Sequence, residues 1–134
     1  IDFYDDYAHH PTEIKVVLQG VKKVFVRHDK ICIFQPHRIS RLKDLKKEFT
    51  YAFKDADTVI LCPIYSAGEK IKLGFRYDNF AKEIIKNSNV RLFMVENKYQ
   101  LAKFLKKNMY GKKIVIGMGA GSISNWIKEL PDLM

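Results

Sequence analysis

Apolar residues along this chain alternate between short continuous runs and stripes at helical spacing. Residues 31–34 and 58–62 are apolar or β-branched throughout, which is typical of strands buried on both faces of a parallel sheet. Ile14, Leu18 and Val21 instead recur every three or four residues, as on one face of a helix. The repeated switch between the two patterns predicts an α/β fold, namely a Rossmann-like, mostly parallel sheet with helices on both faces.

The expected elements follow one another along the whole chain. Strands are predicted at residues 1–4, 31–34, 58–62, 90–95 and 113–116. A first helix is predicted from Pro11, whose missing N–H costs nothing in a first turn, and others over residues 42–53, 78–85, 98–108 and 123–130. Asp78 is expected to cap the helix that follows it. The stretch that follows residues 65–69, up to Tyr77, is ambiguous between a hairpin and a loop.

Length and composition limit the organisation of the chain. At 134 residues, 47% of them hydrophobic, residues 1–134 are long enough for one compact domain and too short to expect two. No apolar stretch reaches the length of about 18 residues that a membrane span needs, so we expect a soluble protein. The start at Ile1 shows neither a methionine nor a signal peptide, which leads us to expect a piece of a longer protein.

The two cysteines indicate a compartment. Cys32 and Cys62 each lie inside an apolar run that predicts a buried strand, as small unreactive core thiols usually do. A disulfide framework would need more cysteines, and a metal site would need a spacing such as C-x-x-C. We therefore expect a cytoplasmic protein.

The formal net charge of +9 could attract a nucleotide, a nucleic acid or an anionic membrane. Many of the lysines, such as Lys43, Lys46, Lys47 and Lys54, fall on the polar faces of predicted helices, where a solvated surface is the usual role. The sequence has no arginine-rich tail and no zinc-finger spacing. We expect no nucleic-acid and no membrane partner, and keep a stand-alone nucleotide- or RNA-binding module as the alternative.

Polar side chains gather directly after the predicted strands. In open parallel sheets ligands bind at this edge, where loops and helix N-termini converge. The residues concerned are Asp5, Asp6, Tyr7, His9 and His10 after the first strand, His37, Arg38 and Arg41 after the second, and Tyr65 and Glu69 after the third.

These loops also have structural interpretations. The aspartates can cap the next helix and adjacent histidines can be surface residues, which spacing alone favours. Neighbouring histidines project differently and no third ligand is evident, so no metal site is predicted. Arg38 and Arg41, three residues apart, could hold a carboxylate between two guanidinium groups. A basic helix start opposes the helix dipole, and this favours a bound anion there.

The glycine-rich segment at residues 117–122 predicts a tight turn between the last strand and the last helix. It lacks the G-x-G-x-x-G spacing of a dinucleotide loop, and only 13 residues follow Gly121. The chain also lacks the G-x-x-x-x-G-K-[ST] phosphate loop. We therefore do not expect this chain to hydrolyse ATP by itself.

Four segments together resemble one family. They are DDYAHHPTE at residues 5–13, FQPHRISR at 34–41, YSAGE at 65–69 and GAGSI at 119–123. In order and spacing, and over essentially the whole chain, they resemble the C-terminal domain of the Mur ligase family, and the first two segments resemble its alanine-adding members. Ala8 stands where these members usually have glycine, and Ile39 where an aromatic residue often lies.

The resemblance implies an ATP-dependent, ADP-forming ligase of peptidoglycan synthesis. Such an enzyme phosphorylates the carboxylate of UDP-N-acetylmuramate, and the amine of L-alanine then attacks the acyl phosphate. The N-terminal domain that binds the UDP-sugar and the central ATPase domain, which would hold most of the Mg²⁺ ligands, are absent from this chain. The fragment alone is therefore expected to be inactive, and its partners are the three substrates and the other two domains.

The resemblance also implies roles for individual residues. Tyr7, His9, His37, Arg38 and Arg41 would surround L-alanine, with the two arginines gripping its carboxylate. Asp6 would meet the ATP ribose, with Asp5 beside it. It implies no catalytic residue and no metal ligand in this chain. A small amino acid offers little apolar surface, so its charged groups must orient it, and the arginine pair supplies the matching fork.

Overall fold

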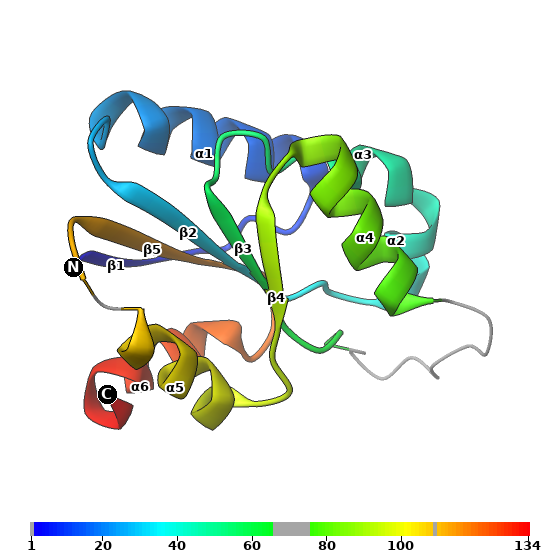
Figure 1. Cartoon of the computed structure of the whole chain (residues 1–134). Coiled ribbons are helices and arrows are strands. Elements are labelled where there is room, and N and C mark those ends of the chain that lie inside the picture. Colours follow the sequence, from blue (N-terminus) through cyan, green and yellow to red (C-terminus); the bar gives the residue numbers. More distant parts are fainter. Residues whose placement is uncertain (1, 66–75, 109) are drawn as a thin grey trace.

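The computed structural model describes residues 2–65, 76–108 and 110–134. Five strands, β1 (Asp2–Asp6), β2 (Asp29–Phe34), β3 (Thr58–Leu61), β4 (Arg91–Met94) and β5 (Lys113–Met118), form one sheet in the order β1-β5-β2-β3-β4. Every neighbouring pair is parallel (Figure 1). The predicted α/β fold with a parallel sheet is confirmed.

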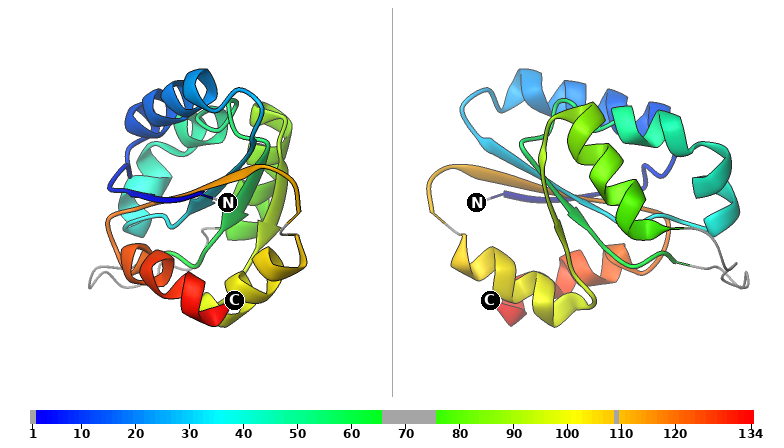
Figure 2. Two further views of the ribbon diagram at one scale, coloured as in Figure 1. Left: turned by 90° about the vertical axis from the view of Figure 1, so that its left-hand side faces the viewer. Right: turned by 45° about the vertical axis from the view of Figure 1, so that its right-hand side comes forward.

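Helices cover both faces of the sheet, as predicted. Helices α1 (Pro11–Val24), α2 (Ile39–Asp44), α3 (Lys46–Tyr51) and α4 (Tyr77–Ser88) lie on one side, and α5 (Lys98–Lys107) and α6 (Ile123–Leu133) on the other (Figures 1 and 2). Pro11 occupies the first turn of α1, also as predicted. Among the described residues, no helix is both long and apolar enough to cross a membrane.

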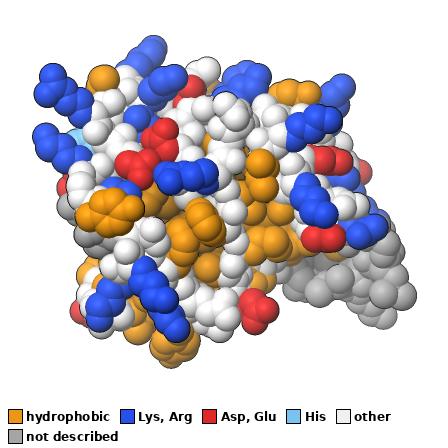
Figure 3. Space-filling view, viewed as in Figure 1, with side chains coloured by type: hydrophobic (Ala, Val, Ile, Leu, Met, Phe, Trp, Pro, Cys, Tyr) orange, Lys and Arg blue, Asp and Glu red, His pale blue; other side chains and the backbone are white. Residues whose placement is uncertain are grey.

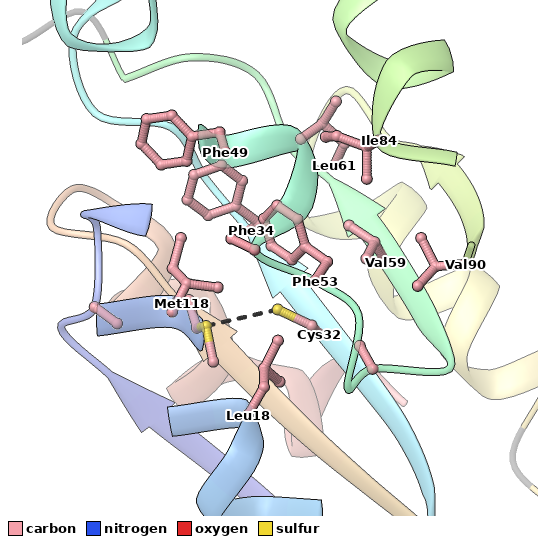
Figure 4. Packing of buried hydrophobic residues seen from close by; sticks show 14 of the residues in the cluster. Leu18, Cys32, Phe34, Phe49, Phe53, Val59, Leu61, Ile84, Val90 and Met118 are labelled. Carbon is pink, nitrogen blue, oxygen red and sulfur yellow. Dashed lines mark hydrogen bonds between the residues drawn. The ribbon is translucent and has the colours of Figure 1, made fainter. Parts of the chain in front are cut away.

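The central strands supply side chains to two hydrophobic cores. Successive residues of a strand point to opposite faces, so Cys32 and Phe34 of β2 join the core under α1, α3 and α4, while Ile31 and Ile33 join the core against α5 and α6. In the first core the ring of Phe34 lies 5.6 Å from Phe49 and 5.2 Å from Phe53, centroid to centroid (Figure 4). This packing explains why the strand is apolar on both faces.

Both cysteines are free, buried thiols, as predicted. The Cys32 Sγ donates to Met118 Sδ at 3.6 Å (Figure 4). Burial raises the pKa of both thiols, to about 12 for Cys62, and the neighbouring Cys62 adds to the increase at Cys32. Because the thiolate is the reactive form, neither thiol is suited to redox or nucleophilic chemistry.

Three strands are longer than the sequence indicates. The strand predicted at residues 31–34 begins earlier, at Asp29. The strand predicted at residues 1–4 continues through Asp5 and Asp6, because these residues pair with Gly117 and Met118 of β5. The strand predicted at 113–116 is extended by the same pairing. The two aspartates therefore belong to the end of β1 and not to the loop after it. The extent of a strand depends on its partner, which here lies more than 100 residues away in sequence.

Two helix predictions also change. The stripe over residues 42–53 forms two short helices, α2 and α3, with a break at Leu45, whose φ and ψ are −114° and 20°. The apolar stripe does not reveal the break because both helices bury their apolar residues in the same core. Helix α4 begins before Asp78, with Arg76 as its N-cap. Asp78 lies in the first turn instead, where an acidic side chain is favourable to the helix dipole.

Candidate functional site

The loop after β1 is shaped by Asp6. Its Oδ1 accepts a hydrogen bond from the backbone N–H of Ala8 at 2.9 Å, which turns the chain away from the sheet. Ala8 is buried, and its φ is not positive, so the backbone accommodates a Cβ at this position. The carboxylate of Asp6 is thereby fixed in orientation at the carboxyl edge of the sheet.

The two adjacent histidines have different roles. His10 is the N-cap of α1: its side chain accepts from Thr12 N, and Glu13 Oε1 accepts from His10 N at 3.1 Å. His9 Nδ1 lies 2.9 Å from the carbonyl oxygen of Tyr7 and 3.8 Å from Glu13 Oε1. A carbonyl only accepts, so His9 Nδ1 carries the proton, and Nε2 is the ring nitrogen that His9 offers to a ligand. The structural interpretation thus holds for His10, while His9 makes its local contacts through Nδ1.

Four aromatic side chains form a row along the carboxyl edge, which we call the ring row: Tyr7, His9, His37 and Tyr65. Centroid distances between successive rings are 5.1, 6.1 and 5.5 Å. His37 and Tyr65 are stacked, with an interplanar angle of 17°. The row brings together segments that follow β1, β2 and β3.

The backbone holds the second half of the ring row in place. Beyond the ends of β2 and β3 the two chains stay paired through a parallel bridge between His37 and Tyr65. Tyr65 N donates to Pro36 O, and Arg38 N donates to Tyr65 O, each at 2.8 Å. Of the segment 65–69 only Tyr65 lies within the described residues, and Glu69 lies outside them.

Both arginines singled out from the sequence line one hollow of about 400 Å³, together with Ser40, Asp44 and Leu45. Arg38 is exposed at the N-cap of α2, and Arg41 is half-buried in that helix. The Nη1 of Arg41 is buried and has no hydrogen-bond partner among the described residues. A buried N–H without an acceptor is costly, so the guanidinium group of Arg41 would gain from an acceptor such as an anion.

The backbone at Arg38 is strained. Its φ of 66° and ψ of 132° lie in a region that residues with a Cβ rarely adopt. Such conformations cost on the order of 1–3 kcal/mol and persist where the surrounding structure enforces them, often at binding sites. Here the hydrogen bond from Arg38 N to Tyr65 O fixes the conformation.

This strain gives a prediction for stability. The Arg38→Gly variant should be about 1 kcal/mol more stable than Arg38→Ala, because glycine adopts positive φ without a Cβ clash. At Ser40, inside α2, the order should reverse: Ser40→Gly should be less stable than Ser40→Ala, because glycine destabilises a helix relative to alanine. Urea unfolding of the four variants measures both differences. Equal stability of Arg38→Gly and Arg38→Ala would contradict the strain.

The side chain of Asp5 contacts helix α6, which covers the face of the sheet opposite to α1. Its Oδ2 accepts from Ser124 Oγ at 2.6 Å, which ties the end of β1 to α6. Because neighbouring strand residues alternate in direction, Asp6 points to the other face of the sheet. The structure therefore separates the two aspartates, which the sequence analysis placed side by side.

Gln35 was not singled out from the sequence, although it organises this edge. It is buried, its Nε2 donates to Ser122 Oγ and its Oε1 accepts from Ile123 N, both at 2.9 Å. Gly119 has a φ of 150°, and a Cβ there would lie 2.8 Å from Gln35 O. The prediction of a tight strand-to-helix turn is thus confirmed. The feature of the sequence that could have identified Gln35 is a single amide side chain at the end of an apolar run.

The described residues contain no group of three or more His, Cys, Asp or Glu side chains that could hold a metal ion. They therefore do not provide a fit for Mg²⁺, and we derive no step through a metal in this chain. The candidate site consists of the ring row, the arginine hollow and the carboxylate of Asp6.

Comparison with known proteins identifies the family. The model of one family, described as Mur ligase, glutamate ligase domain, matches residues 1–121. This chain belongs to the Mur ligase family. The resemblance drawn from the sequence motifs is thereby confirmed.

Two curated relatives of this Mur ligase chain have the same enzyme name. The UDP-N-acetylmuramate–L-alanine ligase of Pelagibacter ubique is 71% identical over 133 residues, which are 99% of this chain and 29% of that protein. The enzyme of the same name from Caulobacter vibrioides is 38% identical over 127 residues, 95% of this chain and 27% of that protein. This chain thus spans less than a third of the length of these curated relatives.

Solved structures agree with the Mur ligase assignment. The UDP-N-acetylmuramate-alanine ligase of Thermotoga maritima superposes with a TM-score of 0.68 at 26% identity, covering 97% of this chain and 26% of that one. A murein peptide ligase of Psychrobacter arcticus gives a TM-score of 0.74 at 17% identity, covering 98% and 27%, and at that identity it supports the fold alone.

Proposed function

We propose that this chain is the C-terminal domain of a cytoplasmic UDP-N-acetylmuramate–L-alanine ligase of peptidoglycan synthesis, and that it binds L-alanine and the ATP ribose. The observation that carries the proposal is the arginine hollow, lined by an Arg41 whose Nη1 has no hydrogen-bond partner among the described residues, in a chain 71% identical to an enzyme of that name. The domains that bind the UDP-sugar and the ATP phosphates with Mg²⁺ would be supplied by the rest of the protein.

The alanine site follows from the chemistry of the ligand. L-alanine has a carboxylate, an amine and a single methyl group, so charge-assisted hydrogen bonds must supply most of its orientation. Arg38 and Arg41 would bind the carboxylate in the hollow. His37, next to Arg38, and His9, with its Nε2 available as an acceptor, would face the amine end, and Tyr7 would close the ring row beside them.

The ATP assignment rests on Asp6. One carboxylate oxygen is held by Ala8 N, and the other has no hydrogen-bond partner among the described residues, so it can accept from a ribose hydroxyl. Asp5 would contribute indirectly, because its contact with Ser124 ties the end of β1 to α6.

The contribution of this domain to catalysis would be positioning. Phosphate transfer from ATP to the muramate carboxylate gives an acyl phosphate and ADP, and attack by the neutral amine of alanine gives the amide and phosphate. The amine must lose a proton and approach the acyl carbon in the correct direction. Two guanidinium groups that hold the carboxylate of alanine would lower the entropic cost of this approach. Orienting a reactant in this way can supply a large part of a rate enhancement.

A direct assay tests the proposal. The full-length protein containing this chain should form UDP-N-acetylmuramoyl-L-alanine, ADP and phosphate from the three substrates, and should prefer L-alanine to D-alanine and glycine. Product is measured by mass spectrometry and ADP release by a coupled assay. Absence of ligation with L-alanine, in a protein shown to be folded, would refute the proposed function.

The net charge of +9 is the observation behind the alternative, a stand-alone nucleotide- or RNA-binding module. On the face seen in Figure 3, Lys and Arg side chains are spread apart, with Asp and Glu among them, and do not form one continuous basic patch. Membership of the Mur ligase family and this distribution favour the ligase. Salt-sensitive binding of oligonucleotides tighter than binding of ATP would instead favour the alternative.

A further inference from the structure

Tyr65 occupies a special position in the site, because it touches two segments that line it. Its ring is stacked on His37, with centroids 5.5 Å apart. It also packs against Gly121 of the turn after β5: a Cβ on Gly121 would lie 2.5 Å from Tyr65 Cγ and 2.8 Å from its Cδ1. Tyr65 therefore fills the space between the end of β2 and the glycine-rich turn.

The requirement for glycine at residue 121 comes from this ring. Gly121 is not among the glycines with positive φ, so its backbone conformation would tolerate a side chain. The three nearest atoms to a Cβ at this position all belong to Tyr65. The absence of a side chain at Gly121 thus serves to admit the tyrosine ring.

The place of His37 depends on Tyr65 from two directions. The ring of Tyr65 stacks on the imidazole, and its backbone pairs with Pro36 and Arg38 on either side of His37. The adjacent Arg38 lines the arginine hollow. A shift of Tyr65 would therefore also move His37 and Arg38, two of the residues that bind the amino acid in the proposed function.

We propose that Tyr65 and Gly121 form a positioning pair that sets the orientation of His37 and thereby the affinity of the site for its amino-acid substrate. Tyr65 acts through His37 and is not a catalytic residue. The proposal rests on the proposed function, since it concerns the same amino-acid site, and it adds a positioning and affinity-determining residue to it.

Three variants of the full-length enzyme test this pair. Tyr65→Phe keeps the stacked ring and should leave the KM for L-alanine within about twofold of the original. Tyr65→Leu keeps an apolar side chain but loses the planar ring, and should raise that KM by roughly threefold to tenfold. Gly121→Ala displaces the ring from the other side and should raise it by a similar factor. In all three, the KM for ATP should stay within about twofold, because the carboxylate of Asp6 is held by Ala8 N and not by either residue of the pair.

Gly20→Ala in α1 is the matched control for Gly121→Ala, because a Cβ at residue 20 meets no atom within 4 Å. It should leave the KM for L-alanine unchanged. Unfolding midpoints of all variants show whether each is folded. If Gly121→Ala does not fold, the comparison of Tyr65→Phe with Tyr65→Leu decides.

The outcomes separate this inference from the proposed function. An unsubstituted enzyme that does not ligate L-alanine would refute the proposed function itself. In an active enzyme, an unchanged KM for L-alanine in Tyr65→Leu, or an equal rise in Tyr65→Phe and Tyr65→Leu, would overturn the positioning role of the ring. A rise in the KM for ATP as large as that for L-alanine would overturn it as well, since it would indicate general damage to the site.

Discussion

Replacing Arg41 by alanine in the full-length enzyme is expected to raise the KM for L-alanine by roughly tenfold to more than a hundredfold, while the KM for ATP changes little. The Nη1 of Arg41 is buried and has no partner among the described residues, so a bound carboxylate would supply its acceptor. Loss of a hydrogen bond to a charged group costs about 1.5–3 kcal/mol, which corresponds to this change in affinity. Steady-state kinetics with L-alanine as the varied substrate measure it.

Two further variants make the Arg41 prediction specific. Arg41→Lys keeps the charge but loses the planar fork, so it should give an intermediate KM. Lys43→Ala removes a positive charge from the same helix, but Lys43 does not line the arginine hollow, and its KM for L-alanine should remain unchanged. Equal effects of Arg41→Ala and Lys43→Ala would attribute the change to net charge and contradict the assigned contact.

Replacing Phe53 by alanine is expected to lower the free energy of unfolding of this domain by about 3–5 kcal/mol. Phe53 lies in the turn after α3, is fully buried and packs against Phe34 of β2 (Figure 4). Its removal leaves a cavity in a core to which helices α1, α2, α3 and α4 all contribute. Since domains of this size have only about 5–15 kcal/mol of net stability, this loss is a large fraction of the total. Urea unfolding followed by circular dichroism measures the loss.

Phe93 of β4 provides the control for Phe53. It is 41% exposed on the outermost strand, and Phe104, 4.6 Å away, is its ring partner. Phe93→Ala should therefore cost at most about 1.5 kcal/mol, since an aromatic pair at a surface contributes on that order. A loss of stability in Phe93→Ala as large as in Phe53→Ala would show that burial in the first core is not what makes Phe53 important.

Much of the fold could be predicted because it depends on local periodicity. Continuous apolar runs predicted β2 and β3, and stripes at helical spacing predicted helices on both faces. The break at Leu45 and the N-cap at Arg76 could not be predicted in the same way. Both are small backbone changes that leave the apolar face of the segment in place, so the pattern of hydrophobic residues is the same with or without them.

The sequence by itself determined the class of fold, the family and the identity of the polar residues at the carboxyl edge of the sheet, because each of these depends on residue type and spacing. Only the tertiary structure decided how those residues act together. It joined the ring row from segments that follow three strands, assigned His10 to a helix cap, and left an Arg41 nitrogen without a described partner. It also placed Tyr65 on Gly121, 56 residues further along the chain. These contacts depend on strand order and on close packing between distant segments, which periodicity along a chain does not encode.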